Sequence, residues 1–324
     1  MKKVIFAVML VACMVTVAVA ADHANSVARP GVVAGSKMPA HPFVHTKAIE
    51  AAATKIIISD AADDVVNVYN TSGHELAQLT GFSLPQGLAT DAKGTLYVAD
   101  TENSRIQVYT SPYKKAPKTL SDSGQYPAGV SVFNNGEYVA VTNIISTSDG
   151  PGSVTIYKNG KAGSPISNSD FARVYFCAFD KSGNLYVDGE NSSGDFQVGE
   201  IAKVTKGGTK WTTLTIGNSI EFPGGVQVTT KGLIAIDDQE AATVYSYNPP
   251  KKGSLGSPVD TTAITGSSDA VTFAFTSTNT DLWTADASNA NSAEYAYPKG
   301  GSAITTISVG GEPIGAAVVP AEIP

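Results

Sequence analysis

Three acidic residues at similar positions along the chain are candidates for binding a metal ion. Glu221, Asp269 and Glu312 each lie one or two residues before a short, mostly apolar segment. If these segments are equivalent strands that meet around one axis, the three carboxylates line one rim. A hard cation such as Ca²⁺ binds several converging oxygen ligands, so a calcium-dependent carboxylate site is the alternative here, and the first hypothesis is that the propeller holds no metal.

Histidine and cysteine offer little further chemistry. Three of the four histidines precede residue 54, and the fourth, His74, follows Asn70-Thr71-Ser72-Gly73, a sequence that predicts an exposed hairpin loop. Cys177 is the only cysteine after residue 20 and lies in the apolar segment 175–179. No histidine is available there to activate the thiol, so Cys177 is predicted to be a small buried side chain. We assign no catalytic residue.

A processed N-terminus offers a copper or nickel site. If signal peptidase cuts after Ala20, the chain begins Ala21-Asp22-His23. The free amine, two backbone amides and the imidazole could then surround Cu(II) or Ni(II) in a square plane. The alternative is a histidine that falls there by chance in a flexible tail, and cleavage after Ala21 would destroy the arrangement.

The candidate residues must be positioned by a repeated unit, which is most complete at residues 84–109. It contains a short apolar strand over 84–90, a turn with Gly94, a second strand that ends at Asp100, and a third strand over 105–109. Gly94 permits a positive φ in the turn. Three short strands joined by tight turns cannot bury their own faces, so the unit needs copies packed beside it.

Copies of this unit recur along the chain. Equivalent positions, separated by 42, 47, 49, 47 and 43 residues, are Pro85, Pro127, Val174, Pro223, Ala270 and Pro313. This period is typical of four-stranded propeller blades. The first copy, from Lys55, lacks the Pro-x-Gly strand, and the chain finishes with that strand alone. We therefore predict an all-β, six-bladed β-propeller with four-stranded blades, closed by the C-terminal strand joining blade one.

The unit at residues 84–109 resembles an NHL repeat, and the array over about residues 54–320 resembles six-bladed NHL-type β-propellers. The resemblance is carried by Pro85, Gly87, Gly94, Asp100, Asn103, Arg105, Ile106, Val108 and Tyr109. Other blades keep fragments of the pattern, with Val65 at the Arg105 position of blade one and Val174 at the Pro85 position of blade four. The family includes protein-binding, RNA-binding, lyase and lactonase-like members, so it implies a fold more than a function.

The resemblance implies that sites lie at the mouth of a central channel. The six strand starts place there Gln86, Ala128, Tyr175, Gly224, Val271 and Ile314. Related senescence marker protein and gluconolactonase-like propellers hold a divalent cation at this position with Glu, Asn and Asp, whereas none of these six residues is a carboxylate. The candidate ligand-binding residues at the mouth are Gln86, Tyr175, Glu221, Asp269 and Glu312.

This neutral, mostly small or apolar lining favours binding over bond-breaking. The first hypothesis is a monomeric, non-catalytic binding module without a cofactor, which presents its loops to a protein, peptide or glycan. The alternative is a lactonase-like hydrolase or lyase that uses Glu221, Asp269 and Glu312 with Ca²⁺. Whether the protein is an enzyme stays open at this point.

The N-terminal residues and the net charge indicate the localisation of the protein. Residues 1–20 combine two lysines, an apolar run and an Ala-Val-Ala end, which is typical of a secretory signal peptide and too short for a membrane span. A lipid anchor at Cys13 is the alternative. Residues 21–53 are predicted to be a flexible tail or linker, and 54–324 the propeller. Cleavage removes both lysines and changes the formal net charge from −7 to −9, which argues against nucleic-acid binding and favours a secreted or periplasmic binding protein.

Two rows of repeated residues are predicted to be structural. Acids that follow the second strand of a blade are expected to accept backbone N–H bonds in Asx-type turns, and they are Asp60, Asp100, Asp238 and Asp286. Asp100 is also expected to pair with Arg105. Aromatic residues on the third strand are expected to pack between blades, and they are Tyr69, Tyr109, Tyr157, Tyr247 and Tyr297.

Overall fold

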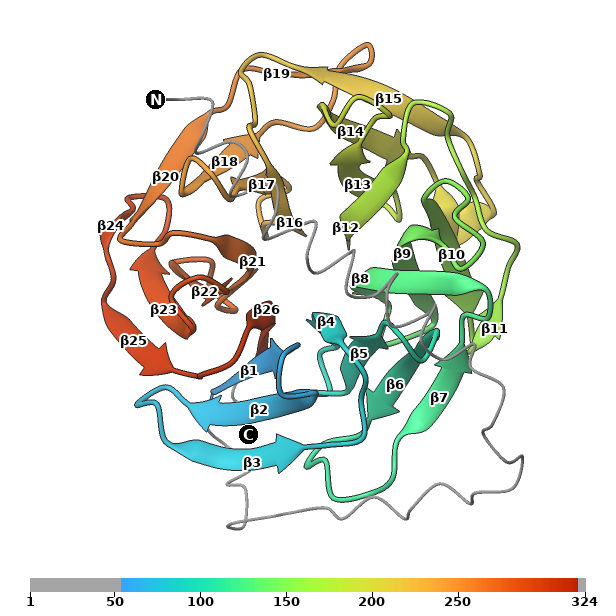
Figure 1. The fold of residues 1–324 in the computed structure, drawn as a ribbon. Coiled ribbons are helices and arrows are strands. Elements are labelled where there is room, and N and C mark those ends of the chain that lie inside the picture. Colours follow the sequence, from blue (N-terminus) through green and yellow to red (C-terminus); the bar gives the residue numbers. More distant parts are fainter. Residues whose placement is uncertain (1–53, 320–324) are drawn as a thin grey trace, which may run out of the picture. The chain divides into compact units, whose positions relative to one another are not determined.

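The computed structural model describes residues 54–319, in which the regular structure is β-strand apart from one 3₁₀ helix, η1 (Val204–Lys206). Six sheets form a ring, and each has one strand nearest the centre (Figure 1). These innermost strands are β26 (Pro313–Val319), β4 (Pro85–Thr90), β8 (Gln125–Phe133), β12 (Arg173–Phe179), β16 (Pro223–Val228) and β21 (Ala270–Phe275). Each contacts the next around the ring. The predicted six-bladed β-propeller is confirmed.

Blade 1 joins the two ends of the described chain. It consists of β26, β1 (Lys55–Asp60), β2 (Val65–Asn70) and β3 (Glu75–Leu79). β26 pairs antiparallel with β1, from Val319 opposite Lys55 to Pro313 opposite Asp60, and every residue of both strands is buried. Figure 1 shows red β26 beside blue β1. Closure by the C-terminal strand is therefore confirmed.

Blades 2, 3 and 6 are four-stranded and antiparallel. Blade 2 adds to β4 the strands β5 (Leu96–Asp100), β6 (Arg105–Tyr109) and β7 (Lys118–Ser121). Blade 3 adds to β8 the strands β9 (Tyr138–Ser146), β10 (Ser153–Lys158) and β11 (Lys161–Ala162). Blade 6 adds to β21 the strands β22 (Asp281–Asp286), β23 (Asn291–Ala296) and β25 (Thr305–Ser308).

Blades 4 and 5 carry a short fifth strand in addition to the predicted four. Blade 4 contains β12, β13 (Leu185–Glu190), β14 (Phe196–Ile201), β15 (Trp211–Ile216) and β19 (Ser254–Gly256). Blade 5 contains β16, β17 (Ile234–Asp238), β18 (Thr243–Tyr247), β20 (Asp260–Thr265) and β24 (Gly301–Ser302). Both extra strands pair in parallel and come from the next blade along the chain. They cover backbone groups that an outer edge otherwise leaves unpaired.

The repeated tyrosines pack between blades. Tyr69 of blade 1 lies in one buried cluster with Trp283 of blade 6, and Tyr157 of blade 3 lies in another with Tyr97 of blade 2. The large aromatic area buried in this way helps to fix neighbouring blades to each other.

In blade 6 the repeated tyrosine is Tyr295, not Tyr297. Tyr295 stands opposite Leu282, just as Tyr109 stands opposite Leu96 in blade 2. The prediction from the sequence was wrong by two positions, because tyrosine occurs at both position 295 and position 297. Tyr297 instead lies edge-on to Phe275, with 4.6 Å between the ring centroids.

The Pro-x-Gly pattern has a structural cause at the start of the innermost strands. The register between β4 and β5 shifts between Pro85 and Leu88, and comparable shifts occur at the other five starts. Such bulges bend a strand and release residues from the ladder. A Cβ on Gly87 would collide with the carbonyl oxygen of Ala128 in the next blade. The glycine therefore lets neighbouring strands approach closely.

Candidate functional site

The two ends of the ring carry different chemistry. We call the end at which the innermost strands begin face A, and the opposite end, at which they finish, face B. The second strand of each blade runs antiparallel to the innermost strand, so it finishes at face A. Asp100 and Asp238 therefore belong to face A, and the turns after β4 and β16 belong to face B.

The predicted channel-mouth residues lie at face A. Tyr175 is buried, and its hydroxyl donates a 2.9 Å hydrogen bond to Oε2 of Glu190. Gln86 is partly buried, and its backbone carbonyl accepts a 2.6 Å bond from the Ser59 hydroxyl. Ala128, Gly224 and Ile314 are buried, and Val271 is partly buried. Among these six residues, Gln86 and Val271 are the most exposed.

Hydroxyl side chains connect neighbouring innermost strands below this mouth. The Thr142 hydroxyl accepts a bond from the Gly129 N–H in its own blade and donates to the Tyr175 carbonyl of the next, at 2.8 and 2.5 Å. Ser59 makes the same two contacts, from the Gly315 N–H and to the Gln86 carbonyl. Each hydroxyl satisfies one donor and one acceptor that would otherwise be buried unpaired.

The acids at the ends of the second strands have the predicted structural role. Asp100 is fully buried and accepts bonds from the Ser83 N–H, the Asn103 amide, the Gln107 amide and Nε of Arg105. Backbone N–H groups likewise donate to Asp60, Asp238 and Asp286. Each acid ties the connection before one blade to a hairpin of that blade. The Asp100–Arg105 pair is confirmed, with Nε 2.6 Å from Oδ2.

Charge is separated between the two faces. Every lysine within residues 54–319 lies at face B, in a turn, at a strand end or in a connection on that side. Face A holds both arginines of this part of the chain, each paired with a carboxylate, Arg105 with Asp100 and Arg173 with Glu190. The majority of the aspartates and glutamates lie at face A. Face A is therefore strongly acidic.

The three acids predicted as a rim are all at face A but do not converge equally. Burial and the charge of Asp286 raise the pKa of Asp269 to about 6, although a bond from Ser288 opposes the rise. Burial, followed by the charges of Asp269 and Asp60, raises the pKa of Glu312. Glu221 is exposed, and its charge acts instead on Glu240 and Asp238. Asp269 and Glu312 thus form an electrostatically coupled pair that Glu221 does not share.

Two further acids of face A were missed in the sequence. Asp188 and Asp237 are fully buried and occupy the position that Thr142 has in blade 3, opposite the bulge of the innermost strand. Oδ1 of Asp188 accepts a 2.8 Å bond from the Phe176 N–H. Its Oδ2 and both carboxyl oxygens of Asp237 have no hydrogen-bond partner among residues 54–319. Burial raises the pKa of both carboxyls well above the usual range.

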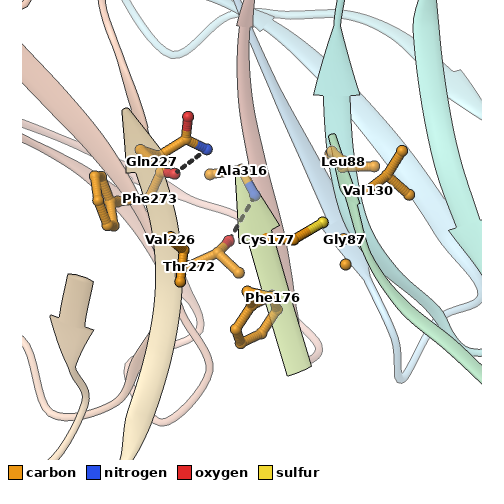
Figure 2. Close-up of a pocket in the computed structure, with 12 residues that line it drawn as sticks. Gly87, Leu88, Val130, Phe176, Cys177, Val226, Gln227, Thr272, Phe273 and Ala316 are labelled. Atoms are coloured by element: carbon orange, nitrogen blue, oxygen red, sulfur yellow. Dashed lines mark hydrogen bonds between the residues drawn. The ribbon is translucent and has the colours of Figure 1, made fainter. Parts of the chain in front are cut away.

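A cavity opens at face B. It has a volume of about 290 Å³ and is lined by the later residues of all six innermost strands and by the turns after β16 and β21. A smaller cavity of about 20 Å³ lies beside it, towards face A, and both are lined by Leu88, Val130, Cys177, Gln227 and Ala316. Figure 2 shows residues of the smaller cavity, with Gln227 at one side and Phe176 at another. Room for about one water molecule makes it a constriction.

The remaining predicted side chains are where the sequence placed them. His74 is exposed in the turn between β2 and β3. Cys177 is buried in β12, and burial raises the pKa of its thiol.

Among residues 54–319 no group of three or more histidine, cysteine, aspartate or glutamate side chains has a metal-binding arrangement. No helix in this range is long and apolar enough to cross a membrane.

Several predictions fall on residues before 54. They are the signal peptide, the alternative anchor at Cys13, the tail over 21–53 and the metal site at Ala21, Asp22 and His23. All of them lie outside the described residues and stay predictions.

Comparison with known families identifies one repeat. Residues 82–109 match the NHL repeat, which covers the first three strands of blade 2. The match contains the whole unit over 84–109, so the resemblance predicted from that unit is confirmed. The chain is a six-bladed β-propeller that contains an NHL repeat.

Solved structures show the same fold. The chain is similar to one in a crystal structure of a nidogen/laminin complex, with a TM-score of 0.67 and 13% identity over 83% of this chain and 100% of that chain. It is also similar to proteins of unknown function from Bacteroides caccae and from Desulfotomaculum acetoxidans DSM 771. Their TM-scores are 0.61 and 0.54, with 12% and 13% identity over 83% of this chain and 99% of theirs. No curated protein matches the chain.

Proposed function

We propose that this protein is a non-catalytic binding module of the periplasm or the extracellular space, and that face A binds a positively charged segment of a partner protein. The observation that carries the proposal is the separation of charge. The lysines of residues 54–319 are all at face B, and the two arginines at face A are already paired. Complementary charge increases association rates and selects among partners.

The carboxylates of face A are crowded in a way that a cation would relieve. Burial is the main cause of the raised pKa values of Glu312 and Asp269; the charge of Asp269 adds to the rise for Glu312, and that of Asp286 to the rise for Asp269. Each of these groups is therefore harder to ionise in part because its neighbours are negative. A lysine or arginine side chain placed between Asp269 and Glu312 would favour both ionised forms, and that gain is part of the binding energy.

The comparisons support a binding role. The similar chain with a TM-score of 0.67 comes from a complex of nidogen and laminin. A propeller fold also offers many loops on a rigid support, which suits recognition of large partners.

Secretion is the second half of the proposal. It depends on residues 1–20, whose charged start, apolar run and Ala-Val-Ala end predict a signal peptide. N-terminal sequencing of protein recovered from periplasmic and culture fractions tests it. A start at Ala21 keeps the arrangement predicted to bind Cu(II), whereas a start at Asp22 destroys it. An intact N-terminus at Met1 in those fractions would contradict processing.

The face A proposal is tested with defined peptides. An oligolysine and an oligoglutamate of equal length serve as probes in a binding titration with the full protein. We expect binding of the oligolysine alone, weakened by more than about tenfold between about 50 and 300 mM salt, because screening acts on exposed charges. The variant Asp269→Asn/Glu312→Gln should bind less tightly.

A matched variant provides the control. Glu75→Gln/Glu137→Gln changes the net charge by the same amount at face B, where Glu75 begins β3 and Glu137 lies in the turn between β8 and β9. It should bind the oligolysine as the unmodified protein does. Equal weakening by both double variants would show a general effect of net charge and would remove face A as the site.

A calcium-dependent hydrolase or lyase is the second candidate, favoured by the electrostatic coupling of Asp269 and Glu312. Its expected readout is thermal stabilisation by Ca²⁺, since a ligand at 100 times its dissociation constant adds about 2.7 kcal/mol. The Asp269→Asn/Glu312→Gln variant should lose that stabilisation. A melting temperature that is the same with Ca²⁺ and with a chelator would reject this candidate.

A further inference from the structure

The cavity at face B is separate from the acidic residues of face A. Its volume of about 290 Å³ is at the lower end of the range of about 300–1,000 Å³ for small-molecule sites. The constriction of about 20 Å³ beside it, towards face A, has room for about one water molecule. The cavity at face B therefore suits a ligand smaller than a typical drug.

The wall of this cavity carries no charged side chain within the described residues. Its polar members include Thr90, Ser131, Gln227, Thr230, Thr276 and Asn279. The thiol of Cys177, which also lines it, stays protonated because burial raises its pKa. An ionised ligand would lose its hydration here without gaining an ion pair, which is costly. The wall selects against charged ligands.

Several of these polar groups are held in place and still have bonding capacity towards the cavity. Nε2 of Gln227 makes a long bond of 3.4 Å to the Phe273 carbonyl, and its side-chain oxygen is turned away from that carbonyl in Figure 2. The Ser131 oxygen accepts a bond from the Phe179 N–H, so its proton is available to donate. Asn279 is fixed by bonds with Thr230 and Thr276. Fixed groups lose little entropy when they bind a ligand.

An aromatic ring completes the wall. Phe275 is partly exposed, and Tyr297 and Phe273 lie edge-on to it at centroid distances of 4.6 and 5.3 Å. A ring held from two sides offers a rigid apolar surface. Hydroxyl and amide groups beside such a surface match a ligand with many hydroxyl groups and an apolar C–H face.

We propose that the cavity at face B binds an uncharged, polyhydroxylated ligand of monosaccharide size. Gln227 accepts a hydrogen bond from a ligand hydroxyl, Ser131 donates one, and the C–H face packs on Phe275. The site is independent of the charge-dependent partner at face A.

Ligand-observed NMR tests the proposal on the full protein. D-glucose, D-galactose and N-acetyl-D-glucosamine are the neutral probes, and D-glucuronate is the charged probe. We expect saturation transfer to at least one neutral sugar and weaker transfer to glucuronate. Binding should change less than about twofold between about 50 and 300 mM salt, because no charge is involved. Loss of one buried hydrogen bond in Gln227→Met should weaken binding by about tenfold.

Two further variants make the result unambiguous. Ser131→Ala removes a small polar group of the wall and should also weaken binding, while Gln78→Met removes a partly buried amide from the outer strand β3 and should not. A melting curve for each variant separates loss of the site from loss of the fold. No transfer to any neutral sugar would overturn the proposal. Tighter binding of glucuronate, or equal binding by Gln227→Met and Gln78→Met, would do so as well.

Discussion

Faces A and B are built from the same six innermost strands, but the strands pack closely at face A and leave a cavity at face B. At face A the strand starts are bulged, adjacent strands approach closely, and polar side chains bond to backbone groups. At face B the same strands leave a cavity of about 290 Å³. Where the strands approach closely at face A, polar side chains bond to the backbone of the neighbouring strand. At face B, polar side chains keep bonding capacity towards the cavity. Face A is therefore suited to attract positive charge, and the cavity at face B to enclose a small neutral molecule.

Because the acids of face A are charged and the cavity wall at face B is not, the two sites select their ligands in different ways. Acids at face A act over about 10 Å in dilute salt and are exposed in part, so they steer a partner before contact. The uncharged side chains that line the face B cavity act only at contact distance. We therefore expect binding at face A to depend on salt and pH, and binding at face B to depend on shape.

The largest expected effect is loss of both faces together. Removal of residues 311–324 takes away β26, whose seven residues are all buried and which pairs with β1. We expect aggregation, or a loss of stability comparable to the whole net stability of a domain, about 5–15 kcal/mol. Thermal unfolding and light scattering measure it. Removal of residues 320–324 alone is the control, and equal melting curves for both truncations would contradict closure through β26.

The closing strand shows which parts of the fold a sequence can predict. Glu312 and the Pro-x-Gly segment after it could be recognised as a displaced first strand because the bulged start has a residue pattern of its own. The extra strands β19 and β24 could not, since they are three and two residues long and pair only because a neighbouring edge is free. Short strands of this kind depend on tertiary structure alone.

The site was harder to predict than the fold. Gln86 and Tyr175 both lie at face A, but the sequence does not show that Tyr175 is buried and bonded to Glu190. Asp237 stands beside Asp238, and only the register shows that it turns inward while its neighbour binds the turn. Gln227 looks like an ordinary alternating strand residue. A cavity depends on how six strands converge, and no local pattern encodes that.

The second prediction compares two ion pairs at face A whose arginines differ in exposure. Arg105→Leu leaves Asp100, which is fully buried, without its cation, and we expect a loss of about 3 kcal/mol. Arg173→Leu breaks a longer pair in which the arginine is 36% exposed and the buried Glu190 keeps the bond from the Tyr175 hydroxyl, so we expect a smaller loss of about 1 kcal/mol. Chemical denaturation measures both. A smaller loss for Arg105→Leu than for Arg173→Leu would contradict the assigned roles.

The third prediction concerns the hydroxyl bonds between strands. Thr142→Val keeps the shape of the side chain but leaves the Gly129 N–H and the Tyr175 carbonyl without this hydroxyl, so we expect a loss of about 2 kcal/mol. Thr284→Val is the control, because Thr284 is equally buried but its bonds to Ala293 are long, at 3.3 and 3.4 Å. Sugar binding at face B should be unchanged in both. Equal losses would mean that bond geometry is unimportant here.

The last prediction concerns Asp237→Asn, whose effect on the free energy of unfolding grows with pH. Burial, with Asp238, Asp269 and Asp286 adding repulsion and the Asp238 backbone opposing it in part, holds the pKa of Asp237 above its unfolded value.

An acid whose pKa is raised in the folded state costs no stability below the unfolded pKa, about 3.9, where both states are protonated. As pH rises above that value the unfolded state ionises first, so the unmodified protein loses stability. Asparagine does not titrate. Asp237→Asn should therefore match the unmodified protein near about pH 3.5 and become increasingly more stable than it towards about pH 8.

Asp269→Asn is the comparison. Its advantage should grow only up to about pH 6, the pKa of Asp269, and then stay constant. Denaturant unfolding at about pH 3.5, about 5, about 6 and about 8 measures both curves. If Asp237→Asn were less stable than the unmodified protein at the highest of these pH values, the carboxylate would be stabilised by partners in the folded state. Asp237 would then be a structural acid like Asp100, and the distinction between bonded and unbonded acids at face A would fail.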